Sequence, residues 1–318
     1  MAIPKGSLEK ATVEMFSATT LDVRFSERSY RPFVSDPELY IKVLRPQEIP
    51  TLVEQGFYDL GISGRDWIAE TGADVKELLD LRYGSVKLVV AGPISLEKST
   101  DEIVEHFARS GKKLRIYTEY PNLASRFIAS LPSYVRIYGM IMPRVYTPWF
   151  SYGENEMVSI FLSFGATEAK PPEEADLVVD VTETGTTLQE NGLKVIDTIM
   201  QSNAVLIANR SSLKDAAKRE KMLDILALLR GAVEAKNRLH IFVNVKEENL
   251  SALIAELPSL KGPTISKLST EGWYAVNTVI DRDQYLKILP KLRRLAQGLV
   301  VHNPVAILPL EDIGIEGY

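Results

Sequence analysis

The sequence predicts an α/β protein that ends in a smaller α+β domain, and three observations support this. The chain has 318 residues, and a typical domain has roughly 150, so two or three domains are expected. Short apolar strand-like runs alternate with helical patterns through the first two thirds, as in sheets of mainly parallel strands. From Leu239 onward the order becomes β-α-β-β-α-β, the ferredoxin-like motif.

Composition excludes several classes of protein. Hydrophobic residues make up 45% and charged residues 25%, which is ordinary for a globular chain. The net charge of −5 argues against a nucleic-acid or membrane-surface binder, because such proteins carry a basic excess. With no cysteine, disulfides, thiol nucleophiles and Cys-ligated metals are excluded. No signal peptide or long apolar run is present, so we expect a soluble cytoplasmic protein.

Histidine chemistry is also restricted. The three histidines are His106, His240 and His302, and no two of them lie within four residues of each other. This spacing excludes a metal-binding HExxH helix. A Ser-His-Asp hydrolase stays open, although no G-x-S-x-G motif supplies its nucleophile. His302 follows two valines in a strand-like run, so we expect it to pack or to form a local hydrogen bond.

Residues 1–92 combine strand and helix patterns. Strands are predicted at 40–44, 59–63 and 87–91, where apolar residues lie beside turn residues. A helix is predicted after Pro46, with apolar residues at core spacing. Those core positions are Ile49, Leu52, Val53 and Phe57. The strand–helix–strand order predicts mainly parallel strands.

A second α/β region follows. Strands are predicted at 114–117, 158–161 and 177–181, and Asn122 is the predicted N-cap of a helix. Residues 138–153 are rich in aromatic residues and proline, which predicts a long loop. A packed Ω-like excursion is the simpler interpretation, and a lid or a subunit contact are the alternatives.

The last third begins with a long charged helix, predicted at 212–237, that connects to a series of strands and helices. In chain order these are strand 239–245, helix 247–257, strands 264–268 and 273–280, helix 283–297 and strand 299–308. This order predicts a ferredoxin-like domain.

The most informative segment is residues 176–188, where an apolar strand runs into a loop of hydroxyl residues and one glycine. Backbone N–H groups at a helix start, threonine hydroxyls and a glycine that permits close approach can together hold an anion. Thr186 or Thr187 is predicted to cap the helix through a capping box, and Gly192 to end it.

The acidic residues of this segment suggest a second role. Asp180 and Glu183 are unsuited to phosphate, but they suit ribose hydroxyls or a Mg²⁺-bound sugar. The segment is neither a Walker A loop nor a Rossmann G-x-G-x-x-G motif. The simpler alternative is a capped helix after a buried strand, because hydroxyls also satisfy backbone donors.

The string VDVTETGTTLQENGL at 179–193 resembles the phosphoribosyl-diphosphate loop of phosphoribosyltransferases, and in full length it resembles one family, ATP phosphoribosyltransferase of histidine biosynthesis. Further segments resemble signatures of that family in the same order. They are IPKGSL at 3–8, RPQEIP at 45–50, DLGISGRD at 59–66, YPNL at 120–123 and LIANR at 206–210. The resemblance covers essentially the whole chain.

The resemblance implies a two-lobed catalytic unit like type II periplasmic binding proteins, followed in the long form by a ferredoxin-like (ACT-like) regulatory domain. We therefore expect one lobe at 1–92 with 204–236, a second lobe at 93–203 and a regulatory domain at 237–318. The resemblance also implies a homo-oligomer, from dimer to hexamer. It implies no partner resembling histidyl-tRNA synthetase, because only the short form lacks the third domain.

The resemblance further implies that N1 of the adenine of ATP attacks C1′ of phosphoribosyl diphosphate (PRPP) and expels pyrophosphate, with Mg²⁺ as cofactor and metal ligands unknown. Asp180 and Glu183 are expected on the ribose hydroxyls and residues 184–187 on the 5-phosphate. Lys5 is expected on pyrophosphate or on the ATP phosphates, and these two acids and Lys5 are the catalytic candidates. The full expected PRPP set is Asp180, Thr182, Glu183, Thr184, Gly185, Thr186 and Thr187.

Candidates for ATP come from segments of the first lobe. They are Lys5, Gly6, Arg45, Gly61, Ser63, Gly64 and Arg65. A solvated lysine and an ordinary turn are the simpler alternatives for Lys5 and for the glycine–serine turn. Histidine is expected to inhibit through Asn244, Thr264 and Leu268. Asn244 stands where an acidic residue would pair with the amino group of the inhibitor.

Two functions of other classes fit part of the same pattern. A non-catalytic solute-binding protein shares the two-lobed fold, because fold alone does not fix function. A catalytically silent subunit whose C-terminal domain senses an amino acid is the other. The phosphate loop argues against both, and the absence of an export signal argues against the first.

Overall fold

The computed structural model describes residues 1–26, 29–257, 262–308, 310 and 314. Contacts divide the chain into two units, Met1–Glu9 with Val43–Ser212 and Lys10–Lys42 with Leu213–Tyr318. Among the described residues, no helix is long and apolar enough to cross a membrane.

The first sheet has the strand order β4-β1-β5-β14-β6. Strands β1 and β5 are parallel, whereas β14 is antiparallel to both β5 and β6. Helix α2 packs Ile49 and Val53 against Ala2, Val205 and Ile207 of this sheet. The elements are β1 (Ala2–Pro4), β4 (Lys42–Leu44), α2 (Ile49–Glu54), β5 (Leu60–Gly64), α3 (Arg65–Thr71), β6 (Val75–Asp80) and β14 (Ala204–Asn209).

The second sheet has the order β10-β9-β11-β8-β12-β7-β13. Strands β9, β11, β8 and β12 are mutually parallel, and β10, β7 and β13 run antiparallel to their neighbours. Its elements are β7 (Val86–Pro93), α4 (Thr100–Ser110), β8 (Leu114–Thr118), α5 (Pro121–Ser130), α6 (Pro132–Tyr138), β9 (Pro143–Tyr146), β10 (Ser151–Tyr152), β11 (Asn155–Leu162), η1 (Thr167–Ala169), β12 (Leu177–Thr182), α7 (Thr186–Glu190) and β13 (Leu193–Ser202).

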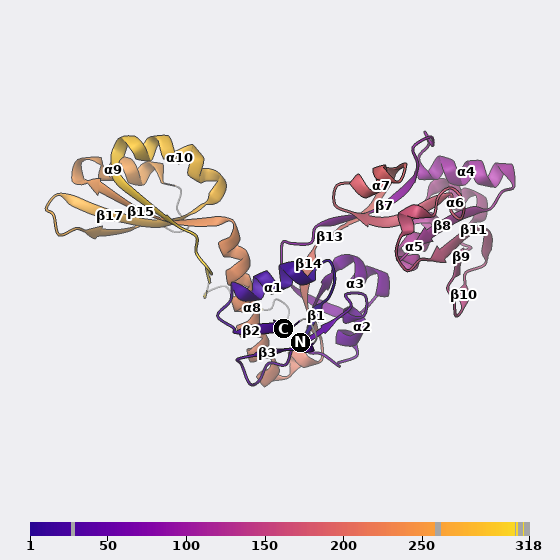
Figure 1. Cartoon of the computed structure of the whole chain (residues 1–318), viewed down its shortest axis with the longest axis horizontal. Helices are drawn as coiled ribbons and strands as arrows, with labels where there is room; N and C mark the ends of the chain where they lie inside the picture. Colours follow the sequence, from indigo (N-terminus) through magenta and orange to yellow (C-terminus); the bar gives the residue numbers. More distant parts are fainter. Residues whose placement is uncertain (27–28, 258–261, 309, 311–313, 315–318) are drawn as a thin grey trace. The chain divides into compact units, whose positions relative to one another are not determined.

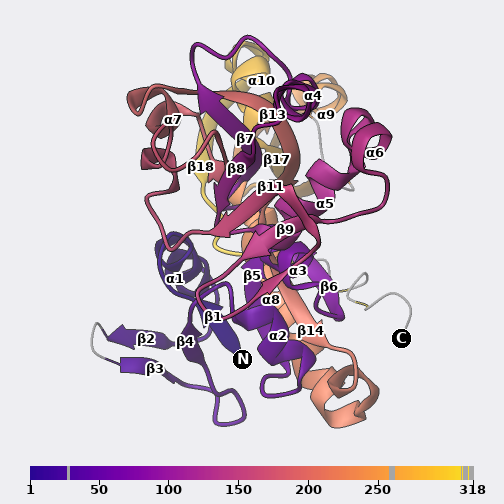
Figure 2. The same cartoon turned by 90° about the vertical axis from the view of Figure 1, so that its right-hand side faces the viewer.

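The two sheets, drawn in Figures 1 and 2, share one strand order. In each, three strands stand in the order second, first, third by their place in the chain, followed by an antiparallel strand and then a last strand. In the first sheet this is β4-β1-β5-β14-β6, and in the second it is β11-β8-β12-β7-β13. This is the two-lobed arrangement of type II periplasmic binding proteins, as predicted. The two sheets with their helices are called the first lobe and the second lobe below.

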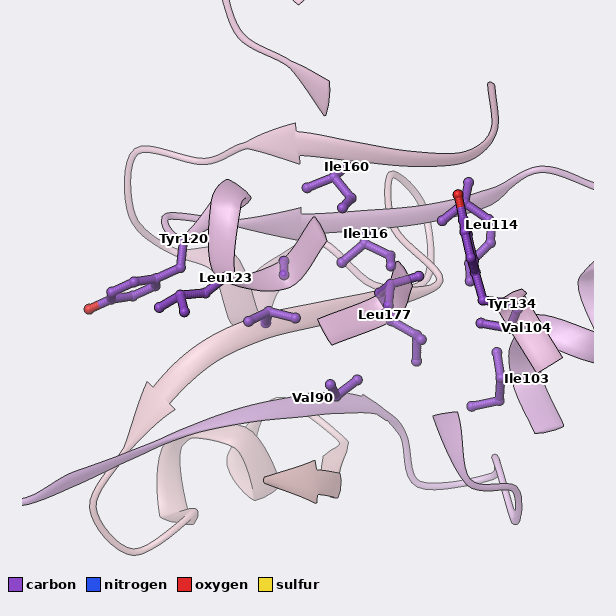
Figure 3. Packing of buried hydrophobic residues seen from close by; sticks show 14 of the residues in the cluster. Val90, Ile103, Val104, Leu114, Ile116, Tyr120, Leu123, Tyr134, Ile160 and Leu177 are labelled. Carbon is purple, nitrogen blue, oxygen red and sulfur yellow. The ribbon is translucent and has the colours of Figure 1, made fainter. Parts of the chain in front are cut away.

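The core of the second lobe forms where helices cover one face of its sheet. The alternating burial of β8 places Leu114 and Ile116 inward, beside Ile160 on β11 and Leu177 on β12 (Figure 3). Each such side chain contributes about 1.5–3 kcal/mol when it is fully buried. Tyr134 is fully buried as well, and its hydroxyl donates to the carbonyl of Ile141 at 2.7 Å.

The loop predicted at 138–153 contains two short strands that were not predicted. Residues 143–146 form β9, which pairs in parallel with β11 and in antiparallel fashion with β10. Pro143 is compatible with a strand because it is the first residue, where a missing N–H is tolerated. Gly153 is required at the end of the hairpin, since a Cβ there would lie 2.0 Å from the Pro143 carbonyl oxygen. The segment therefore extends the sheet.

Two smaller predictions in the catalytic unit are also wrong. Phe57 is 70% exposed, because α2 ends at Glu54 before the predicted core position is reached. Asn122 does not cap α5, which begins at Pro121 with Tyr120 as its N-cap. Asn122 instead donates its backbone N–H to Glu70 of α3 at 2.9 Å.

The second unit contains the long helix α8 (Ala216–Lys236), capped by Asp215, whose carboxylate accepts from the Lys218 N–H. It also holds α1 (Glu9–Ser17) and the hairpin of β2 (Val23–Ser26) and β3 (Ser29–Val34). Neither α1 nor this hairpin was predicted.

The C-terminal part of this unit confirms the ferredoxin-like prediction. Its sheet has the order β16-β17-β15-β18, all antiparallel. Helices α9 and α10 cover one face (Figure 1) and pack Leu253, Ile288 and Leu292 into its core. The elements are β15 (Arg238–Lys246), α9 (Glu247–Glu256), β16 (Thr264–Lys267), β17 (Trp273–Asp281), α10 (Arg282–Leu295) and β18 (Ala296–His302).

The final strand ends at His302, earlier than the predicted residue 308. The predicted domain end at Tyr318 lies outside the described residues. His302 is exposed, and its ring lies 5.8 Å from Phe242 and 6.1 Å from His240 between centroids.

Candidate functional site

The carboxyl ends of the parallel strands β8, β11 and β12 gather the polar residues of the second lobe. Ligands of α/β sheets bind at such edges, because loops after the strands meet there. Glu119 follows β8, Ser163 follows β11, and the hydroxyl-rich loop follows β12. The predicted phosphate loop therefore stands at the edge where a ligand is expected.

The loop after β12 has a conformation that only glycine adopts easily. Gly185 has φ = 85°, and its N–H donates to Thr182 Oγ1 at 2.7 Å. A Cβ at Gly185 would meet nothing within 4 Å, so the space beside it is open. Thr184 and Thr186 are exposed, and their hydroxyl oxygens lie 2.8 Å apart.

The helix that follows, α7, begins differently from the prediction. Its N-cap is Gly185, and no side chain caps it. The predicted capping box with Thr186 or Thr187 is therefore wrong, whereas the prediction of an early end is confirmed, with Asn191 as the C-cap and Gly192 at φ = 71°. The first N–H groups of a helix lack intrahelical partners, so this turn can donate hydrogen bonds to an anion. Because no side chain caps α7, the threonine hydroxyls are also available to such an anion.

Asp180 is the carboxylate of this region that burial perturbs most. Burial, together with the charges of Glu168 and Glu119, raises the pKa of Asp180 to about 6. The Val181 N–H donates to Asp180 Oδ1 at 2.7 Å and partly offsets this increase. A carboxylate that is costly to ionise and has few donors is suited to hydroxyl donors from a ligand. Glu183, by contrast, is exposed.

The glycines and the serine of the first-lobe turn are engaged in packing. A Cβ at Gly61 would lie 2.7 Å from Ile49 and 2.8 Å from Val53, so glycine lets α2 approach β5. Ser63 is buried and donates to the Pro46 carbonyl oxygen at 2.8 Å. At Gly64, a Cβ would lie 2.0 Å from the carboxylate of Asp66.

The basic candidates of the first lobe differ in their surroundings. Arg65 forms ion pairs with Glu77 and Asp80, at 3.0 Å from Nε and 3.1 Å from Nη1, and the pKa of its guanidinium is raised mainly by the hydrogen bond to Glu77. Arg45 is exposed, and its Nη1 would lie 3.9 Å from a Cβ at Gly6. Lys5 directly follows β1, and its N–H donates to the Leu44 carbonyl oxygen. Lys5, Gly6 and Arg45 therefore form one neighbourhood beside β1.

A buried polar network that the sequence did not reveal joins the two lobes. Asp66, on α3, accepts from Tyr120 at 2.7 Å and from Ser202 at 2.6 Å. The Tyr120 ring stacks on Trp67 at 4.2 Å between centroids. Burial, followed by the charge of Asp66, raises the pKa of Tyr120 far above its usual value, so the phenol stays a donor. Figures 1 and 2 show α3 and α5 in adjacent positions.

A second contact of the same kind fixes the start of α5. Glu70 accepts from the backbone N–H groups of Asn122 and Leu123, at 2.9 and 2.8 Å. A carboxylate at the first turn also complements the helix dipole. The β8–α5 turn, which carries Glu119, is thereby anchored to α3.

The sequence and the fold of this chain are similar to those of known proteins. A sequence model of the ATP phosphoribosyltransferase family matches residues 45–231, more than half of the chain. A relative named ATP phosphoribosyltransferase from Solibacter usitatus is 37% identical over 310 residues, which is 96% of this chain and 97% of that protein. One from Thermodesulfovibrio yellowstonii is 36% identical over 315 residues, 97% and 98% of the two chains.

The chain belongs to the ATP phosphoribosyltransferase family. It is therefore a phosphoribosyl-transferring enzyme of histidine biosynthesis. The model of the C-terminal domain of this family matches residues 235–303, so the chain has the long form. Its fold is also similar to that of the ATP phosphoribosyl transferase (HisG:HisZ) complex from Thermotoga maritima. That likeness has a TM-score of 0.57 and 25% identity, over 73% of this chain and 97% of that one.

The predicted regulatory residues of this ATP phosphoribosyltransferase lie on two parts of the C-terminal sheet. Asn244 is exposed on β15 and pairs with Ala275 on β17 and Gly298 on β18. Thr264 begins β16, at the edge of the sheet, and Leu268 follows that strand. The three residues do not form one cluster by any contact among the described residues, and their role stays a prediction.

Proposed function

We propose that the second lobe of this ATP phosphoribosyltransferase holds PRPP and that residues of the first lobe hold ATP. The β12–α7 turn takes the 5-phosphate through backbone N–H groups and through Thr184, Gly185, Thr186 and Thr187. Thr182 shapes this turn by accepting from the Gly185 N–H. Asp180 accepts from a ribose hydroxyl, and Glu183 stays the candidate from sequence for a second carboxylate. The observation that carries the proposal is the open, donor-rich turn next to a half-buried carboxylate.

The reaction requires charge stabilisation more than proton transfer. The lone pair of adenine N1 forms the new bond to C1′, and the C1′–O bond to pyrophosphate breaks with its electrons on the leaving group. Positive charge develops on the ribose and then on the adenine ring. Carboxylates near C1′ stabilise such charge when they are already oriented, and a fixed ribose reduces the entropy cost of attack. No general base is needed at N1.

Mg²⁺ is a cofactor that the family implies, and the donor set permits one binding mode. Among the described residues, no three His, Asp or Glu side chains lie together as a metal site. Mg²⁺ is usually held by substrate phosphates with one or two carboxylates, so we place it on the pyrophosphate of PRPP. There it would neutralise charge on the leaving group.

On the ATP side, the proposal separates contact residues from supporting residues. Lys5, Gly6 and Arg45 lie together beside β1, and we assign them to the ATP phosphates. Gly61, Ser63 and Gly64 pack α2 and α3 onto the sheet, and the Arg65 guanidinium is engaged by two acids. We therefore propose that these four shape the site without contacting the nucleotide.

Regulation and assembly follow the long form. We propose inhibition by histidine at the C-terminal domain, a homo-oligomer between dimer and hexamer, and no need for a synthetase-like subunit. The domain boundaries that we propose are 1–92 with 204–236, 93–203 and 237–318. Titrating histidine into the assay tests the first point, and a rate that is unchanged across the millimolar range would contradict it.

The experiment that tests the function uses the purified chain alone with ATP, PRPP and Mg²⁺. We expect pyrophosphate release together with a change in the adenine ultraviolet spectrum, because N1 becomes substituted. No product would contradict the proposal for the long form. Product that forms only after addition of a synthetase-like partner would indicate the short-form arrangement instead.

A further inference from the structure

Glu119 stands level with Asp180 in the second sheet. Strands β8 and β12 are parallel, and their register pairs Val179 with Thr118. Glu119 directly follows Thr118, and Asp180 directly follows Val179, so each lies one residue beyond this pair. The charge of Glu119 also acts on Asp180, so the two carboxylates lie near each other. Ionisation is unfavourable for both side chains, since burial raises the pKa of Glu119 and the pKa of Asp180.

Gln47, from the first lobe, adds an independent observation. Its side chain hydrogen-bonds to Glu119, which partly offsets the effect of burial on the pKa of Glu119. Its Oε1 is buried and has no hydrogen-bond donor among the described residues. A buried acceptor without a donor destabilises the folded state. A ligand that brings a donor would remove that cost.

The group formed by Asp180, Glu119 and Gln47 Oε1 consists of acceptors. Phosphate oxygens are acceptors too and carry negative charge, so this group does not suit them. Ribose hydroxyls are donors, and PRPP has two of them next to C1′, on C2′ and C3′. The turn that receives the 5-phosphate continues the same strand β12, which places the sugar between the turn and this group.

Glu183, the second acid predicted from sequence, is placed less favourably. It follows the end of β12, three positions after Asp180. Asp180 lies within β12, whereas Glu183 lies in the bend that follows the strand. Glu183 is also exposed, whereas Glu119 is half-buried beside Asp180.

We propose that Glu119 is the second carboxylate of the ribose site and accepts a hydrogen bond from one of the two ribose hydroxyls of PRPP. Asp180 accepts from the other, and Gln47 holds Glu119 from the first lobe. The inference rests on the proposed function, because it names a further contact to the same substrate.

The structure also shows how Glu119 is kept in place. Its neighbour Tyr120 is anchored to Asp66, and Asn122 and Leu123 are anchored to Glu70. The Tyr120 N–H further donates to Thr118 Oγ1 at 2.8 Å. The turn is therefore rigid on both sides of Glu119, which limits the entropy cost of presenting the carboxylate.

The test measures kcat/KM of the full-length enzyme for PRPP and for its 2-deoxy and 3-deoxy analogues. Glu119→Gln is expected to lower kcat/KM for PRPP about 30-fold, as for a lost hydrogen bond to a charged group. With the analogue that lacks the hydroxyl held by Glu119, wild type and variant should agree within about threefold, because no contact remains to be lost. KM for ATP should stay unchanged.

Matched variants control for charge and for folding. Glu190→Gln removes an exposed charge on α7 and should leave kcat/KM near the wild-type value. Glu183→Gln should cost less than Glu119→Gln. Glu119→Asp, which retains the charge on a shorter side chain, should recover part of the loss, and it serves as the test variant if the glutamine variant does not fold.

A pH profile gives a readout that a structural role would not change. The charges facing Asp180 are those of Glu119 and Glu168. If Glu119 stands beside Asp180, its neutralisation lowers the pKa of Asp180. The acid limb of kcat/KM for PRPP should then move to lower pH in Glu119→Gln and stay in place in Glu190→Gln.

Three results would overturn the inference while leaving the proposed function intact. One is an active Glu119→Gln enzyme whose kcat/KM for PRPP is within threefold of the wild-type value. Another is an equal loss with PRPP and with both deoxy analogues. The third is a loss that excess Mg²⁺ restores, which would make Glu119 a metal ligand. A wild-type enzyme without turnover would instead contradict the proposed function itself.

Discussion

The two lobes share a topology but use their polar residues differently. In the first lobe, most of the residues predicted to bind ATP already have contacts within the protein. Gly61 and Gly64 allow close packing, and Arg65 forms ion pairs with Glu77 and Asp80. In the second lobe, the space beside Gly185 is open, and Asp180 is half-buried, with a pKa that is raised mainly by burial. A motif of glycine and charged residues can therefore serve packing in one lobe and binding in the other, and only the surroundings distinguish the two uses.

The largest expected effect concerns Asp180. Asp180→Asn removes a charged acceptor for the ribose hydroxyl, so kcat/KM for PRPP should fall on the order of 100-fold, the upper range for a hydrogen bond to a charged group. KM for ATP should change less than about twofold, since additivity holds for separate sites. Steady-state kinetics with each substrate varied in turn measures both, and a parallel loss for ATP would contradict the division between lobes.

The same substitution should stabilise the fold at neutral pH. The pKa of Asp180 is about 6 in the folded chain, against 3.8 for an ordinary aspartate, so the ionised form destabilises the folded state above pH 6. This cost disappears as the pH falls through 6 toward 4. At pH 7.5, Asp180→Asn should raise the free energy of unfolding by up to about 3 kcal/mol.

Urea midpoints of wild type and Asp180→Asn, compared at pH 7.5, 5 and 4, test this sign. The difference should be largest at pH 7.5 and close to zero at pH 4. A variant that is less stable at pH 7.5, or a difference independent of pH, would show that Asp180 is already well solvated by the protein.

A pair of glycine substitutions compares the lobes directly. Gly61→Ala places a methyl group against Ile49 and Val53 and should cost about 1–3 kcal/mol of stability, with little change in KM for PRPP. Gly185→Ala meets no atom but must adopt φ = 85°, a strain of about 1–2 kcal/mol. The turn should relax, and KM for PRPP should rise about tenfold.

Thermal midpoints and KM values for the two alanine variants provide the comparison. We expect the larger drop in Tm from Gly61→Ala and the larger rise in KM for PRPP from Gly185→Ala. The reverse pattern would mean that the first-lobe turn, and not the β12–α7 turn, contacts PRPP.

The smallest effect is expected at Arg65. Its ion pairs are partly solvated, with 36% of the side chain exposed, so Arg65→Gln should cost less than about 1 kcal/mol of stability because of solvent screening. KM for ATP should change less than about threefold, since the guanidinium is already engaged. A tenfold rise in KM for ATP would instead establish Arg65 as a nucleotide contact.

Sequence patterns identified the features that depend on local order. The apolar run of β12, the hydroxyl-rich turn and the β-α-β-β-α-β order all lie within short segments, where periodicity and turn residues are informative. Conversely, the pairing of Glu119 with Asp180 joins residues 61 positions apart and depends on β8 and β12 being neighbours. Spacing along the chain carries no such information.

Other errors have local causes. The β9–β10 hairpin was missed because Pro143 and Pro148 are typical of loops, although a strand tolerates proline as its first residue. Asn122 and Thr186 were assigned as caps by residue type, but tertiary partners use Asn122, and Gly185 begins α7. The strand β14 and helix α3 were also missed. These elements are short, and tertiary packing stabilises them more than their own sequence does.

The measurement that most directly tests the account is the binding of PRPP and of ATP to Asp180→Asn/Thr186→Val by calorimetry in the presence of Mg²⁺. The account predicts that this double variant binds PRPP at least 100-fold more weakly, on the order of a lost charged hydrogen bond, and binds ATP as wild type does. Unchanged PRPP binding, or an equal loss for both substrates, would contradict the assignment of PRPP to the second lobe.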